Sequence, residues 1–234
     1  MDYHPTMPVD TVFLDAGGVL LFPDWDRLAV TLRQHGVAAQ PDVLARAELR
    51  AKRQLDDGQT IRLTSDRERG WVYFNLVLEH AGVSRSAATD AALAELQEYH
   101  ARHNLWSHVP PEVPDALTAL RSHGLRLVVV SNANGTLRAL LDRLGLAPLI
   151  DVAIDSHEEG VEKPDPRLFQ IALERSGASP ERTIHVGDLY HVDVVGARAA
   201  GLRAVLFDPA GLYPDVDCPR IRSLGELVKT VVRC

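Results

Sequence analysis

The sequence predicts an α/β fold, in which a parallel β-sheet is covered by helices and interrupted by a long helical insertion. Three observations support this fold class: short runs rich in Val, Ile and Leu, helical segments between the later runs, and a stretch from about Pro23 to Ser107 without a convincing strand pattern. Buried parallel strands are near-continuous apolar runs. Strands that alternate with helices at this spacing form a parallel sheet with both faces covered.

Five apolar runs are the predicted strands of the core, over residues 11–15, 125–131, 151–155, 183–187 and 203–207. The helices between the later runs have clear end signals. One starts at Pro114 and stops at Gly124, and another starts at Asp165-Pro166 and stops at Gly177. Proline just inside a helix start and glycine just past its end are a common combination. Ser223 and Glu226 predict a capping box for a last helix over 224–232.

The stretch without strands divides into four predicted helices, over residues 26–35, 41–55, 66–81 and 87–104, with Gly36, Gly58 and Gly82 between them. Because this run follows the first strand directly, it predicts an inserted helical cap above a site at the strand ends. We therefore expect a core of residues 1–22 and 108–234 and a cap of residues 23–107. The alternative is that these helices simply extend the core.

Composition excludes several classes of protein. The net charge of −7 over 234 residues argues against general nucleic-acid binding, which needs concentrated Lys and Arg. No apolar stretch approaches the roughly 20 residues that span a bilayer, so no membrane partner is expected. The first ten residues lack the features of a signal peptide, and Cys218 and Cys234 are expected to be reduced thiols. A cytoplasmic protein is therefore expected, and its oligomeric state is left open.

Polar residues follow four of the predicted strands where each strand ends. Ligands of open α/β sheets bind beyond the carboxyl ends of the strands, so these residues are the candidate site. They are Asp15 after the first strand, Ser131 and Asn132 after the second, Lys163 after the third, and Asp188 and Asp193 after the fourth.

Each of these residue types has a role in phosphoryl transfer to water. Asp15 is a candidate nucleophile, because a carboxylate can form an acyl phosphate. Asp15 and Asp188 supply the oxygen ligands that Mg²⁺ prefers. Ser131 can donate a hydrogen bond to a phosphate oxygen, and the backbone N–H groups that follow it, from Asn132 onward, favour an anion. Lys163 supplies a positive point charge. Together these residue types favour phosphoryl transfer assisted by Mg²⁺.

The stretches FLDAGGVL, VVVSNAN, EKPDP and HVGDLYHVDVVGARAAGL resemble the motifs of the haloacid dehalogenase (HAD) superfamily of hydrolases, subfamily I, with a helical C1-type cap. The resemblance implies a Rossmann-like core with the cap inserted after the first motif. It implies that Asp15 is the nucleophile, that Lys163 stabilises charge and that Ser131 binds phosphate. It implies Asp188 and the backbone carbonyl at Gly17 as metal ligands, with Asp193 positioning the metal shell or the lysine.

The sequence departs from the usual first motif of HAD phosphatases, Asp-x-Asp, since it has Asp15-Ala16-Gly17. In the family the second Asp transfers protons, a role worth about 10²–10⁴-fold in rate, and Gly17 has no side chain for it.

Three candidate functions follow from this departure. The first is a Mg²⁺-dependent phosphohydrolase of low or specialised efficiency, with His191 or a cap residue as a substitute acid. The second is an impaired family member that binds a phosphorylated ligand or partner. The third is a 2-haloacid dehalogenase, whose leaving halide needs no proton, although Asp188 and Asp193 argue against it.

Overall fold

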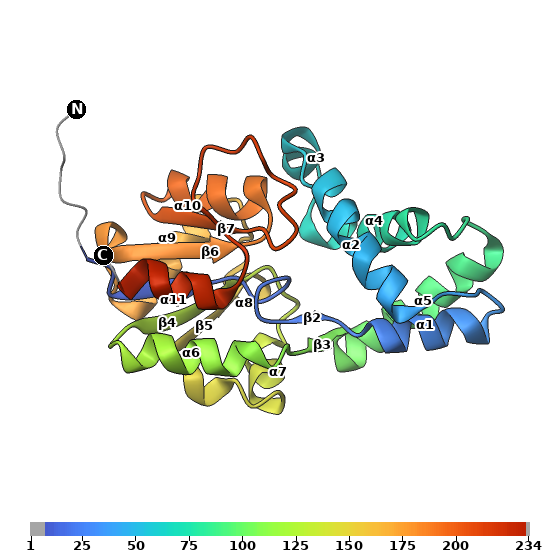
Figure 1. The fold of residues 1–234 in the computed structure, drawn as a ribbon, viewed down its shortest axis with the longest axis horizontal. Helices are drawn as coiled ribbons and strands as arrows, with labels where there is room; N and C mark the ends of the chain where they lie inside the picture. Colours follow the sequence, from blue (N-terminus) through green and yellow to red (C-terminus); the bar gives the residue numbers. More distant parts are fainter. Residues whose placement is uncertain (1–7, 233–234) are drawn as a thin grey trace. The chain divides into compact units, whose positions relative to one another are not determined.

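The computed structural model describes residues 8–232, drawn in colour in Figure 1. The chain divides into two compact units. One contains the described residues up to Leu21 and from Val109 onward, and the other is Phe22–His108. Each unit has a hydrophobic core of its own. The candidate site residues all belong to the first unit, whereas a cap role for the second unit stays a prediction.

The first unit is built on a six-stranded sheet whose neighbouring strands are all parallel. Its strands, in sheet order, are β5 (Val152–Asp155), β4 (Arg126–Ser131), β1 (Thr11–Leu14), β6 (Thr183–Gly187), β7 (Arg203–Phe207) and β8 (Arg220–Ile221). The predicted α/β fold class is confirmed. The five predicted strands are present, three of them one residue shorter than predicted. The two-residue β8 is too short to leave an apolar pattern in the sequence.

Helices cover both faces of this sheet (Figure 1). Those of the first unit are α6 (Glu112–Ser122), α7 (Leu137–Arg143), α8 (Ser156–Glu159), α9 (Pro166–Ser176), α10 (Val195–Ala199) and α11 (Leu224–Val232). A π-helical turn, Tyr190–Val194, precedes α10, and two short 3₁₀ turns lie at Ala147–Leu149 and Pro180–Arg182. Helices α6 and α11 contact each other on one face, and α9 and α10 contact each other on the opposite face.

One predicted helix start and one predicted helix cap of the first unit differ in detail from the structure. Helix α6 begins at Glu112, two residues before the predicted Pro114, because proline is tolerated in a first turn whose N–H groups have no intrahelical partner. Helix α11 has the predicted bounds, and Ser223 Oγ accepts from the Glu226 N–H at 3.3 Å. The Glu226 carboxylate accepts from the Arg222 N–H at 2.7 Å. The reciprocal bond is thus displaced by one residue from a regular capping box.

The second unit contains the helices α1 (Trp25–Gln34), α2 (Pro41–Leu55), α3 (Gly58–Leu63), α4 (Asp66–His80) and α5 (Ala87–His103). Its two ends pair as a short antiparallel ribbon of β2 (Phe22–Pro23) and β3 (Trp106–His108), so the expectation of an all-helical insertion is wrong in this detail. Helix α3 is not among the predicted helices, because a glycine such as Gly58 usually marks the end of a helix in the sequence pattern. The Asp57 side chain caps this helix by accepting from the N–H groups of Gln59 and Thr60.

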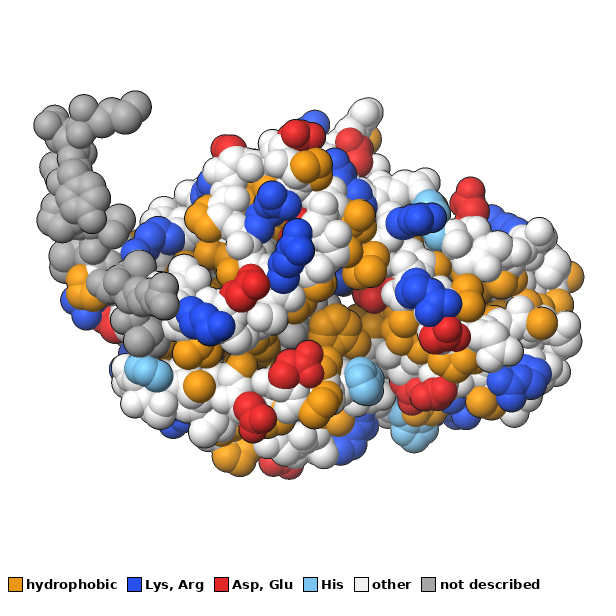
Figure 2. Space-filling view, in the orientation of Figure 1, with side chains coloured by type: hydrophobic (Ala, Val, Ile, Leu, Met, Phe, Trp, Pro, Cys, Tyr) orange, Lys and Arg blue, Asp and Glu red, His pale blue; other side chains and the backbone are white. Residues whose placement is uncertain are grey.

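The surface carries charges of both signs. Lys and Arg side chains are interspersed with Asp and Glu on the face shown in Figure 2. None of the helices within residues 8–232 is long and apolar enough to cross a membrane. The cytoplasmic location and the absence of a nucleic-acid partner stay predictions. Cys218 is a free, partly buried thiol, and Cys234 lies outside the described residues.

Gly196 of α10 allows a close approach that positions the Lys163 segment. A Cβ atom at this position would lie 2.9 Å from the Pro164 Cα and O atoms and 2.9 Å from Phe169 Cε2. We expect Gly196→Ala to lower the free energy of unfolding by about 1–3 kcal/mol, because backbone and a packed ring must move. Urea unfolding of the full chain measures this loss.

The matched control is Gly225→Ala in helix α11 of the same unit. A Cβ there meets only Ser223 Oγ at an ordinary 3.7 Å, and alanine has the higher helix propensity. This variant should be as stable as the wild type or slightly more stable. Equal stability of the two variants would contradict the close packing at Gly196.

Candidate functional site

The site lies at the carboxyl ends of three neighbouring strands. Asp15 directly follows β1, and its N–H donates to the Val186 carbonyl of β6 at 2.9 Å. Ser131 is the last residue of β4, which pairs with β1 on its other side. Asp188 follows β6 directly. The central strand therefore places Asp15 between the ends of its two neighbours, and the predicted residues come together at one sheet edge.

Lys163 is the positive charge of the site and is almost fully buried. Its side chain is 1% exposed, and Nζ lies 2.9 Å from Asp15 Oδ1 and 2.7 Å from Asp193 Oδ1. The lysine comes from the loop between α8 and α9. An ammonium group with two carboxylate partners at this distance is held at a fixed position beside the Asp15 carboxylate.

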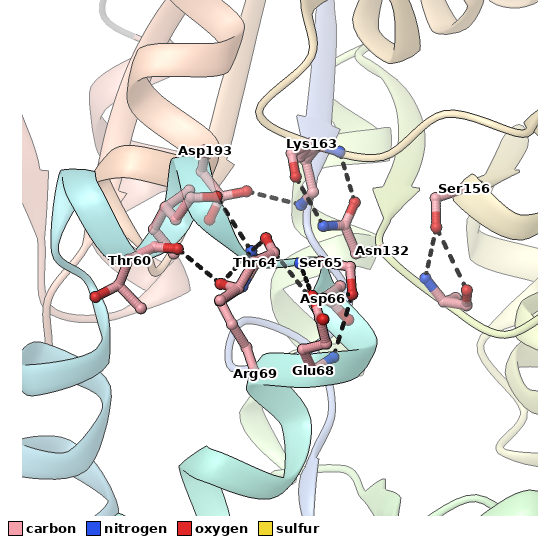
Figure 3. A network of polar contacts seen from close by, with 12 residues as sticks. Thr60, Thr64, Ser65, Asp66, Glu68, Arg69, Asn132, Ser156, Lys163 and Asp193 are labelled. Carbon is pink, nitrogen blue, oxygen red and sulfur yellow. Dashed lines mark hydrogen bonds and ion pairs between the residues drawn. The ribbon is translucent and has the colours of Figure 1, made fainter.

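Asn132 binds the backbone of Lys163. The Lys163 N–H donates to Asn132 Oδ1 at 2.7 Å, and Asn132 Nδ2 donates to the Lys163 carbonyl at 3.0 Å (Figure 3). One side-chain amide therefore fixes both polar groups of the residue that carries the ammonium. The sequence predicts that Asn132 binds substrate, and a direct contact with substrate stays a prediction. The contact of Asn132 with Lys163 is not predicted by the sequence.

The loop that follows Ser131 is held by the end of the neighbouring strand β5. Asp155 Oδ2 accepts from the Gly135 N–H at 2.9 Å. The Ser156 hydroxyl accepts from the Ala133 N–H at 3.0 Å and lies 3.3 Å from the Ala133 carbonyl (Figure 3). Asp155 and Ser156 are not among the predicted site residues, although Asp155 lies at a strand end as those residues do. They fix the backbone that would face an anion beside Ser131.

Asp193 is fully buried and both of its carboxylate oxygens are hydrogen-bonded. Oδ1 lies 2.7 Å from Lys163 Nζ and 3.1 Å from His185 Nε2, and Oδ2 accepts from the Leu189 N–H at 3.0 Å. A Cβ atom on Gly187 would overlap the Asp193 side chain. Gly187 therefore leaves the space that Asp193 occupies. This arrangement favours the role of positioning the lysine among the two that the family resemblance implied for Asp193.

The charges of the site perturb one another. Burial raises the pKa of Asp15 to about 7, and the neighbouring Asp193 and Asp188 add to this, while Lys163 acts in the opposite direction. Burial opposes the charged forms of Lys163 and Asp193. The negative charges of Asp15 and Asp193 nevertheless raise the pKa of Lys163, and Lys163 together with His185 lowers the pKa of Asp193. The pair of Lys163 and Asp193 is thus ionised. Without a bound metal ion, Asp15 titrates near neutral pH.

The donor set fits a divalent cation. Asp15, Asp188 and Asp193 each offer a carboxylate oxygen, and these oxygens lie within 4.8 Å of one another. Lys163 Nζ pairs with two of these carboxylates, those of Asp15 and Asp193. Both carboxylate oxygens of Asp193 are already hydrogen-bonded. Asp15 and Asp188 are therefore the candidate side-chain ligands for Mg²⁺.

Gly17 lies in a tight turn after Asp15. The Ala16 carbonyl accepts from the N–H groups of Leu20 and Leu21, and the Leu21 carbonyl accepts from that of Gly18. The acceptors of these hydrogen bonds are the carbonyls of Ala16 and Leu21. The Gly17 carbonyl, which the sequence predicts as a metal ligand, is not an acceptor in them. That role stays a prediction.

Comparison with known proteins decides the family. A family model described as a haloacid dehalogenase-like hydrolase matches residues 9–201, well over half of the chain. The chain belongs to the haloacid dehalogenase-like hydrolase family. Human haloacid dehalogenase-like hydrolase domain-containing protein 3 is 33% identical over 205 residues, which cover 84% of this chain and 80% of that protein. Phosphoserine phosphatase of Thermus thermophilus is 40% identical over 143 residues, which cover 61% of this chain and 55% of that protein.

Solved structures agree with the HAD-like fold. The HAD-hydrolase YfnB from Bacillus subtilis has a TM-score of 0.69, with 23% identity over 96% of this chain and 99% of that one. The 2-haloacid dehalogenase from Pseudomonas syringae has a TM-score of 0.60, with 26% identity over 96% of this chain and 99% of that one. This HAD-like chain is a hydrolase, and its relatives include phosphatases.

The contact between Gly187 and Asp193 can be tested by a double-mutant cycle. Gly187→Ala should lower the free energy of unfolding of this HAD-like protein by about 1–3 kcal/mol, because the new methyl group overlaps the Asp193 side chain. In an Asp193→Gly background the same substitution should cost much less, since the overlapping atoms are gone. An equal loss of stability in the two backgrounds, measured by urea unfolding, would argue against this steric relation.

Proposed function

We propose that this protein is a Mg²⁺-dependent phosphatase that acts on a small phosphorylated metabolite through an aspartyl-phosphate intermediate on Asp15. The observation that carries the proposal is the position of Lys163 Nζ, 2.9 Å from Asp15 Oδ1 in a buried site that also contains Asp188. A hydrolase whose relatives include phosphatases needs a nucleophile and a positive charge beside the transferring phosphoryl group. These residues supply both.

The proposed reaction has two steps at Asp15. A carboxylate oxygen of Asp15 attacks the phosphorus, and the bond between phosphorus and the leaving oxygen breaks. Water then hydrolyses the aspartyl phosphate, which releases inorganic phosphate and restores the carboxylate. Lys163 and the Ser131 hydroxyl stabilise charge on the phosphoryl oxygens. Bound Mg²⁺ would favour the ionised form of Asp15, with Asp188 and the Gly17 carbonyl as further ligands.

The missing acid at position 17 restricts the substrate class. An alkoxide leaves slowly without a proton, whereas the conjugate base of a stronger acid leaves readily. We therefore propose phosphorylated substrates with good leaving groups, such as acyl phosphates or esters of acidic hydroxyl groups.

A dehalogenase is the second candidate, because a leaving halide needs no proton and a solved 2-haloacid dehalogenase is 26% identical to this chain. The acidic pair Asp188 and Asp193 argues against it, since that chemistry needs no metal. Chloride release from a 2-chloroacid in the presence of a chelator would favour this candidate. The third candidate, a ligand-binding module, would bind phosphate without hydrolysing any ester.

The proposed nucleophile is tested by Asp15→Asn. With Mg²⁺, the wild type should hydrolyse an activated aryl phosphate, and the variant should lose about 10³-fold or more of kcat, because an amide does not replace the carboxylate as nucleophile. Removal of Mg²⁺ by a chelator should abolish wild-type turnover, and added Mg²⁺ should restore it. Release of the aryl alcohol measures both effects.

The matched control is Asp10→Asn, at the opposite end of the same strand, where the carboxylate pairs with Arg182. Its turnover should stay within about threefold of wild type, because a surface ion pair at that edge lies away from the reacting atoms. Full activity of Asp15→Asn, or full activity with a chelator present, would refute the proposed chemistry.

Restoring the acid at position 17 tests whether proton transfer is the missing step. Gly17→Asp should raise kcat for an alkyl phosphate by about 10²–10⁴-fold, the usual contribution of a positioned acid or base. Gly17→Asn has nearly the same shape without the titratable proton, so it should give no gain. Equal rates for the two variants would show that the efficiency of this site is not limited by the acid.

A further inference from the structure

His185 lies in the middle of β6, where the packing would be satisfied by an apolar residue. Its side chain is 0% exposed, and its ring packs edge-on against Phe169 with centroids 4.9 Å apart. Its strand neighbour on β1 is Phe13, a residue of the same apolar face of the sheet. Burying an imidazole in such surroundings costs free energy unless its polar atoms are used, so the contact that it makes is informative.

The side-chain partner of His185 is Asp193. His185 Nε2 lies 3.1 Å from Asp193 Oδ1, the oxygen that also accepts from Lys163 Nζ at 2.7 Å. Burial lowers the pKa of His185, although Asp193 acts in the opposite direction. His185 Nδ1 makes no hydrogen bond of ordinary geometry within the described chain. Because the ionised Asp193 carboxylate can only accept, His185 Nε2 carries a proton and donates it to Oδ1.

Strand β6 and the residues just after it thus determine the orientation of the Asp193 carboxylate at three points. His185 donates to Oδ1, Gly187 leaves the space for the side chain, and the Leu189 N–H donates to Oδ2 at 3.0 Å. With both oxygens held in this way, Oδ1 also accepts from Lys163 Nζ at 2.7 Å. The position of the carboxylate therefore determines where the ammonium group lies.

We propose that His185 is a positioning residue for hydrolysis, whose Nε2–H fixes Asp193 so that Lys163 Nζ stays beside Asp15. The inference rests on the proposed function, in which Lys163 acts on the phosphoryl group at Asp15. It differs from a packing role, which needs the ring of His185 but not its hydrogen bond.

Two variants separate the hydrogen bond from the ring. His185→Phe keeps an aromatic ring and loses the donor, whereas His185→Gln loses the ring and places an amide N–H near the position of Nε2. We expect kcat of His185→Phe to fall about 10–100-fold, the usual cost of losing an outer hydrogen bond to a functional group. Its KM should change less than about threefold, because Ser131 and the loop after it are not altered. His185→Gln should recover most of the lost kcat.

Phe169→Leu is the matched control for packing. It removes the aromatic neighbour of His185 and leaves the hydrogen bond to Asp193 in place, so it should lower the free energy of unfolding with little change in kcat. All variants are assayed with Mg²⁺ and an aryl phosphate, well below their melting temperatures. His185→Leu replaces His185→Phe if the latter does not fold.

Crystal structures of the variants provide a measurement that is independent of turnover. In His185→Phe we expect a rotated Asp193 carboxylate and a Lys163 Nζ that has left hydrogen-bonding distance of Asp15, and in His185→Gln both contacts should persist. An unchanged contact between Lys163 and Asp15 in His185→Phe would overturn the proposal. So would equal kcat losses for the Gln and Phe variants. If the wild type hydrolyses no phosphate ester, the proposed function fails, and the structures still decide the role of His185 in placing Lys163.

Discussion

The buried ion cluster of Lys163 with Asp15 and Asp193 is the interaction on which the rest of the site depends. An ammonium group taken out of water costs several kcal/mol, which only close carboxylate partners offset. Lys163 has two such partners, at 2.9 and 2.7 Å. Loss of either partner weakens this compensation in the interior, so the segment that carries the lysine must be placed within a narrow range. Most other contacts of the site serve that placement.

Three elements distant in sequence meet at this cluster. The amide of Asn132 binds the backbone of Lys163 from the end of β4, while Gly196 of α10 lets the adjoining Pro164 approach closely. On the other side, His185 and Gly187 of β6 define where Asp193 lies. The parallel sheet brings these elements together because it aligns the ends of β1, β4 and β6 at one edge. The register of the sheet therefore also determines where the charged groups lie at this edge.

The sequence predicted the strands and the residues at their ends because both are local features. An apolar run that stops at Asp15 or at Asp188 is visible without tertiary information, and topology then brings the ends together. The partners within the site could not be predicted in the same way. An asparagine after Ser131 has the same appearance whether its amide binds a substrate or, as here, the backbone of Lys163, which is 31 residues away. His185 is a buried residue of β6, and its polar partner Asp193 becomes visible only in the folded chain.

The structure separates two requirements that HAD phosphatases usually meet together. Lys163 lies beside Asp15, yet Gly17 leaves no side chain to transfer a proton. A positioned acid or base is worth about 10²–10⁴-fold, or about 3–5 kcal/mol of activation free energy. Under the proposed function this deficit applies fully to an alkoxide leaving group and vanishes for a leaving group that is stable as an anion. In that proposal the electrostatics of the cluster would direct an anion to Asp15, while Gly17 would restrict which bonds to that anion can break at a useful rate.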